Sequence, residues 1–125
     1  MPVITMSGNI ASGAREVGQA VAQELGMSAV VEAHTPADLE RALGTDARIV
    51  GVNARDLESL EVDLDAALAL AASVPRDRVV VVESGLRSRE DVRRAERAGA
   101  HAVLVGEALM RSADPAETIR ELLGG

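Results

Sequence analysis

The first residues whose spacing suggests chemistry form a glycine-rich segment near the amino end of the chain. Gly8 and Gly13 are separated by four residues and follow the apolar run Val3–Met6. In this spacing, between a strand and a helix, consecutive backbone amides surround a phosphate. Ala14 and Arg15 stand where such loops usually carry lysine and a hydroxyl residue. The segment predicts a phosphate-binding loop made of Gly8, Asn9, Ala11, Ser12, Gly13, Ala14 and Arg15.

A second set of polar residues follows the other apolar runs, at the point where each run ends. Because the carboxyl ends of parallel strands meet at one edge of a sheet, these residues are expected on a single rim, where α/β enzymes place their chemistry. A strand end is also a common place for a polar residue without any function. The set comprises Glu32, Asn53, Arg55, Glu83, Ser84, Gly85, Gly106 and Glu107.

The elements that position these residues alternate regularly along the chain. The expected strands are Val3–Met6, Ala29–Glu32, Arg48–Val52, Val79–Val82 and Ala102–Val105. They are almost wholly apolar, as strands of a buried parallel sheet are. An amphipathic stretch follows each of them, with N-cap residues such as Thr35 and Ser88 at its start and a glycine such as Gly44 at its end.

This order predicts one α/β domain over residues 1–125, built from five βα units around a parallel sheet. We expect a flavodoxin-like sheet of order 2-1-3-4-5 with helices on both faces, because this order places the apolar run Val3–Met6 inside the sheet. A half-barrel of order 1-2-3-4-5 is the alternative.

The composition excludes several classes of function. The chain has 125 residues, with 20 acidic residues against 13 basic ones and no aromatic residue, which argues against nucleic-acid binding. The absence of cysteine and the presence of two histidines exclude disulfides and argue against a metal centre. No apolar run is long enough for a membrane span. We expect a cytoplasmic protein without a cofactor. Its expected small-molecule partner contains phosphate, and its loops could bind a phosphate or sulfate ion.

From Glu24 to Leu123 the sequence resembles the carboxy-terminal half of indole-3-glycerol-phosphate synthase. The strings that carry the resemblance are GVNARDL, ESGL and AVLVGEALM. The resemblance implies units five to eight of a (βα)8 barrel and a lyase activity in tryptophan biosynthesis. It also implies inherited catalytic residues, Glu32, Asn53 and Glu83, and an inherited substrate and phosphate site, Arg55, Ser84, Gly85, Gly106 and Glu107.

One departure from that family is decisive for the expected activity. The family's general-acid lysine belongs to the amino-terminal half of the barrel, and this chain contains no lysine. Ring closure with decarboxylation and dehydration needs placed proton donors. We therefore expect these residues by themselves to lack synthase activity.

Residues 1–26 resemble a different family, the cytidylate-kinase-like P-loop proteins. The carrying residues are the strand VITMS, the loop from Gly8 to Gly13 and the following Arg15. Together the two resemblances suggest a chimera of P-loop and half-barrel units. The expected function is a non-catalytic, engineered scaffold, monomeric or dimeric, that binds phosphate or a nucleotide phosphate. The alternative is a truncated indole-3-glycerol-phosphate synthase that acts only as a half-barrel or a dimer.

Overall fold

The structure is a computed structural model that describes residues 3–6 and 14–125, and side chains from residue 17 onward. Five strands alternate with helices. The strands are β1 (Val3–Met6), β2 (Ser28–Ala33), β3 (Ile49–Asn53), β4 (Val79–Glu83) and β5 (Ala102–Leu104). The helices are α1 (Ala14–Glu24), α2 (Pro36–Leu43), α3 (Leu64–Ala72), α4 (Arg89–Arg97), α5 (Glu107–Met110) and α6 (Pro115–Leu123). The short helix α5 has no counterpart among the expected elements.

The helices begin where their capping residues predict. Thr35 accepts a hydrogen bond from the backbone of Asp38, and the Asp38 carboxylate accepts one from the backbone of Thr35, which completes a capping box at α2. Ser88 and Asp91 form the same reciprocal pair at α4. Each box satisfies backbone N–H groups that the first helical turn leaves unpaired. These local interactions fix the helix starts next to the strand ends that carry the site.

All five strands are parallel, and the order in the sheet is β1-β2-β3-β4-β5. The parallel α/β architecture is thus confirmed, but the flavodoxin-like order 2-1-3-4-5 is wrong. Strand β1 lies at one end of this order and pairs with β2 from Val3 opposite Ser28 to Met6 opposite Val31. Each unit therefore pairs with the next one along the chain, as in the half-barrel alternative.

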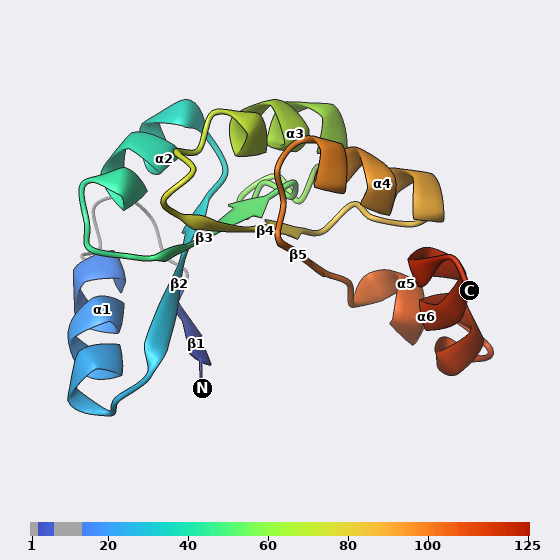
Figure 1. The fold of residues 1–125 in the computed structure, drawn as a ribbon, viewed down its shortest axis with the longest axis horizontal. Coiled ribbons are helices and arrows are strands. Elements are labelled where there is room, and N and C mark those ends of the chain that lie inside the picture. Colours follow the sequence, from blue (N-terminus) through green and yellow to red (C-terminus); the bar gives the residue numbers. More distant parts are fainter. Residues whose placement is uncertain (1–2, 7–13) are drawn as a thin grey trace.

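The sequential order also decides which face of the sheet the helices cover. A crossover between neighbouring parallel strands is right-handed, so a series of them in one direction puts the connecting helices on one face. Figure 1 shows α2, α3 and α4 in a row along one side of the sheet, with α5 and α6 beyond the end of β5. Two layers replace the expected three.

The burial of alternate strand residues follows from this arrangement. On the face towards the helices, Val50, Val52 and Val82 are 0% exposed and form the centre of the core. On the opposite face Val79 is 41% exposed and Leu104 is 58% exposed. The second face is therefore open near β5. No helix among the described residues is long and apolar enough to cross a membrane.

Candidate functional site

Two glutamates from strands on either side of β3 form a pair, in which Glu83 is buried and Glu32 is half-buried. Glu32 lies on β2 opposite Gly51 of β3, and Glu83 ends β4 opposite Asn53. Glu83 is 4% exposed, and its carboxyl shares a hydrogen bond with that of Glu32. Burial first, then this hydrogen bond, then the charge of Glu32 raise the pKa of Glu83 to about 8. At neutral pH the Glu83 carboxyl therefore favours its protonated form, which can act as an acid.

Asn53 lies beside this pair and is held by backbone contacts. Its side-chain oxygen accepts the backbone N–H of Arg55 at 3.0 Å, and its carbonyl accepts a hydrogen bond from Nδ1 of His34 at 2.7 Å. The next residue, Ala54, donates its N–H to the carbonyl of Glu83 at 2.8 Å. These bonds join the carboxyl ends of β2, β3 and β4, so the three predicted residues of the catalytic set lie on one rim.

The loop after β3 is ordered by its own side chains. The Asp56 carboxylate accepts the backbone N–H groups of Ser59 and Glu58, and these bonds, chiefly that of Ser59, lower the pKa of Asp56. Nε2 of His34 lies 3.6 Å from the same carboxylate. His34 thus contacts the end of β3 through the Asn53 carbonyl and the following loop through Asp56.

Arg55 reaches from this loop across the end of β4 to the start of α5. Its Nη2 lies 2.8 Å from Oε2 of Glu107, and its Nη1 donates to the carbonyl of Leu60 at 2.9 Å. The other oxygen of Glu107 lies 3.0 Å from Nη2 of Arg111. Because the ion pair is partly exposed, it contributes modestly to stability, about 0–1 kcal/mol. Its main consequence is geometric, since it ties the loop after β3 to the start of α5.

The loop after β4 begins with two residues in the left-handed region of backbone conformation. Ser84 and Gly85 follow one another with φ values of 67° and 75°. Beside them lies a cavity of about 220 Å³, whose lining includes Ser84, Gly106 and Glu107 of the predicted set. Two arginines, Arg87 and Arg111, also line it and supply positive charge. The predicted set does not include them; Arg87 opens a charged run whose pattern is typical of an exposed helix face.

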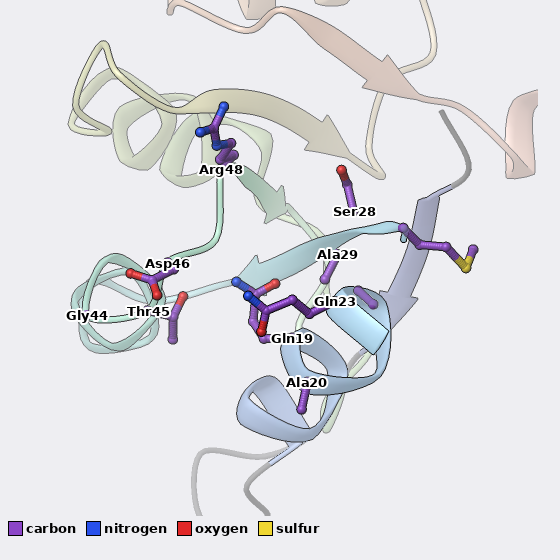
Figure 2. Close-up of a pocket in the computed structure, with 11 residues that line it drawn as sticks. Gln19, Ala20, Gln23, Ser28, Ala29, Gly44, Thr45, Asp46 and Arg48 are labelled. Atoms are coloured by element: carbon purple, nitrogen blue, oxygen red, sulfur yellow. The ribbon is translucent and has the colours of Figure 1, made fainter. Parts of the chain in front are cut away.

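A larger hollow, of about 580 Å³, lies at the opposite rim, where β2 and β3 begin. Figure 2 shows Gln19 and Gln23 of α1 near its centre, with Thr45, Asp46 and Arg48 from the α2–β3 connection around it. None of the predicted site residues whose side chains the structure describes lines it. The size of a hollow is thus not a guide to the site in this molecule. In the described part of the chain, no three His, Cys, Asp or Glu side chains gather as a metal site.

The predicted phosphate loop is not tested by this structure. Gly8, Asn9, Ala11, Ser12 and Gly13 lie outside the described residues. Of Ala14 and Arg15 only the backbone is described, as the first turn of α1.

A sequence model described as indole-3-glycerol phosphate synthase matches residues 12–122. The chain belongs to this family. Among curated relatives, the indole-3-glycerol phosphate synthase of Arthrobacter sp. (strain FB24) is 50% identical over 99 residues, which are 79% of this chain and 36% of the relative. The synthase of Acetivibrio thermocellus is 48% identical over 103 residues, 82% of this chain and 40% of the relative. The chain thus spans about two fifths of the length of the relatives it matches.

Solved structures share the fold. Thiamine phosphate pyrophosphorylase from Pyrococcus furiosus superposes with a TM-score of 0.68 at 19% identity, over 97% of this chain and 56% of that chain. A mandelate oxidase mutant superposes with a TM-score of 0.61 at 26% identity, over 88% of this chain and 40% of that chain. At 19% identity the first likeness concerns the fold alone.

The family match corrects the interpretation of the amino-terminal residues. It begins at residue 12 and therefore includes α1, which the chimera hypothesis assigned to a P-loop ancestor. The comparisons support neither that ancestor nor a non-catalytic scaffold. They favour the alternative interpretation, that the chain is part of an indole-3-glycerol phosphate synthase.

Proposed function

We propose that these residues supply the carboxy-terminal part of the active site of an indole-3-glycerol phosphate synthase. The observation that carries the proposal is the pairing of the buried Glu83 with the half-buried Glu32 beside Asn53, on the rim where the family resemblance places its chemistry. The reaction is a ring closure with loss of carbon dioxide and water, in the synthesis of tryptophan.

Within this reaction the pair has a defined task. Loss of water requires a proton for the departing hydroxyl, and Glu83 holds one at neutral pH because its pKa is raised. Glu32 shares the hydrogen bond that holds the Glu83 carboxyl in place. We infer that Arg55, whose partner Glu107 lines the cavity, binds an anionic substrate group, and that the cavity lined by Arg87 and Arg111 holds the phosphate.

The remaining catalytic groups come from the amino-terminal units of the barrel. The chain contains no lysine, so the family's lysine acid must be supplied by those units. The surfaces that they would cover carry exposed apolar residues at both ends of the sheet. These residues are Val17 and Val21 on α1, Leu25 directly after it, Ile119 and Leu123 on α6, and Leu104 on β5. We propose that the units lie against α1, α6 and the open face of the sheet and complete the barrel.

A complementation experiment tests this function. The chain is co-expressed with the amino-terminal units of the Arthrobacter relative in a bacterial strain that lacks the synthase, and growth without tryptophan is scored. Indole-glycerol phosphate is also measured by fluorescence in the purified mixture. We expect product only when both parts are present, and its loss with Glu83→Gln. Asp77→Asn, at an exposed carboxylate away from the site, is the matched control.

Two results would contradict the proposal. One is a purified complex of the two parts that forms no product. The other is a Glu83→Gln complex as active as the Asp77→Asn complex.

A further inference from the structure

A glycine in the middle of β3 lies between the two carboxyl groups of the site. The two glutamates belong to β2 and β4. Because β3 lies between these two strands, their backbones are about 10 Å apart. Glu32 and Glu83 can meet only by extending across β3. The residue of β3 that pairs with Glu32 is Gly51. The meeting point therefore lies over a position without a side chain.

The backbone of Gly51 does not itself require glycine. Its φ lies outside the left-handed region, unlike that of Gly85, and it continues a regular parallel ladder to both neighbours. A glycine inside a strand weakens the strand, so its presence points to a close approach by another group. That group is the Glu83 side chain: a Cβ at position 51 would lie 2.5 Å from Oε1 and 3.0 Å from Cδ of Glu83.

We propose that Gly51 is a positioning residue for the carboxyl pair: because it has no side chain, the carboxyl of Glu83 lies across β3 and reaches Glu32. The proposal deepens the proposed function, since it concerns the same site. Any side chain at position 51 would occupy the space of the Glu83 carboxyl and push the two glutamates apart. The nearest atom, Oε1 of Glu83, is at the end of a flexible side chain, which can move aside.

A second contact offers a purely structural explanation for this glycine. The same Cβ would lie 3.0 Å from Cγ1 of Val30, which is 7% exposed. Under that explanation Gly51 makes room for the side chain of Val30, and the carboxyl pair does not depend on the glycine. The two explanations differ in what an alanine does to the titration of Glu83.

The test is a carbon-13 NMR titration of the Glu83 carboxyl in the full 125-residue chain, from about pH 4 to about pH 10. The resonance is assigned by its loss in Glu83→Gln. We expect a midpoint near 8 in the unaltered chain and a midpoint lower by about one pH unit or more in Gly51→Ala, because the carboxyl loses its partner and part of its burial. Gly44→Ala is the matched control. A Cβ there would come no closer than 3.4 Å to another atom, and φ is −75°.

Each outcome decides the question. A folded Gly51→Ala chain whose Glu83 titrates as in the unaltered chain overturns the proposal. If Gly51→Ala does not fold, Val30→Ala is added to relieve the second contact, and the double variant is compared with Val30→Ala alone. A lowered Glu83 midpoint in the double variant supports the proposal. Failure of the double variant to fold overturns it, because the glycine then serves packing.

The titration needs neither substrate nor the remaining barrel units. A failed complementation with a lowered midpoint in Gly51→Ala would remove the synthase assignment and leave the positioning role. Successful complementation with an unchanged midpoint in Gly51→Ala would support the synthase assignment and remove the positioning role.

Discussion

Replacing Glu83 by glutamine should change how the stability of the chain depends on pH. In the folded chain the pKa of Glu83 is about 8, against an ordinary value of 4.5. Between these values the folded state binds a proton that the unfolded state does not bind. The free energy of unfolding therefore decreases as the pH rises through this window, and it is constant with respect to Glu83 above about pH 8.

The size of this effect follows from the displacement of the pKa. One pH unit corresponds to about 1.4 kcal/mol, so ionising Glu83 in the folded chain costs several kcal/mol, through its burial, its hydrogen bond with Glu32 and the charge of Glu32. Glutamine has a similar shape and still donates a hydrogen bond to Glu32, but it cannot ionise. We expect Glu83→Gln to have nearly the stability of the unaltered chain at about pH 4 and to be several kcal/mol more stable at about pH 9.

Urea denaturation at a series of pH values, followed by circular dichroism, measures this difference. Asp77→Asn serves as the control, because it also removes one carboxylate but from an exposed position. Equal slopes of stability against pH in Glu83→Gln and Asp77→Asn, between about pH 5 and about pH 8, would refute the reasoning. They would mean that Glu83 is ionised in the folded chain like an exposed glutamate.

Four further substitutions test other parts of the structure. Glu107→Gln should change the free energy of unfolding by less than about 1 kcal/mol, because its ion pair with Arg55 is partly exposed. The same substitution should tighten the binding of inorganic phosphate in phosphorus NMR titrations, because it removes a negative charge from the cavity; weaker binding would contradict the placement of the phosphate in this cavity. Thr35→Ala and Ser88→Ala should each cost about 1 kcal/mol in urea denaturation through loss of a capping box, and no loss would mean that the boxes do not form in solution. Gly85→Ala should cost about 1–3 kcal/mol, because φ is +75° and a Cβ would lie 2.8 Å from a neighbouring side chain; Gly44→Ala, without either feature, should stay close to the unaltered chain in the same melts.

The helix starts and the strand positions were predictable because they depend on interactions between near neighbours. Thr35 and Asp38 are three residues apart, and their reciprocal hydrogen bonds need only one helical turn. The expected strand Val79–Val82 lies within the observed strand Val79–Glu83 for a similar reason, since a run of valines suits a buried parallel strand. The short helix α5 was missed because its four residues, Glu107–Met110, carry no side-chain cap.

The order of the strands was not predictable from the same residues. The apolar run Val3–Met6 fits a strand inside the sheet, and that fit favoured the flavodoxin-like order. An apolar strand at the end of the order, as β1 is, has the same local pattern. Only the pairing of strands decides between the two, and pairing joins residues that are more than twenty positions apart, such as Val3 and Ser28.

The site shows the same division. The sequence by itself determined that Glu32, Asn53 and Glu83 lie at strand ends and therefore on one rim. The reason is that the apolar runs and the residues that begin and end the helices are local properties of the chain. Only the tertiary structure decided that Glu83 is buried against Glu32, that Gly51 leaves the space between them, and that Arg87 and Arg111 line the neighbouring cavity. The proton that Glu83 retains depends on burial and on a second carboxyl fifty-one positions away in the sequence, and neither exists until the strands are packed side by side.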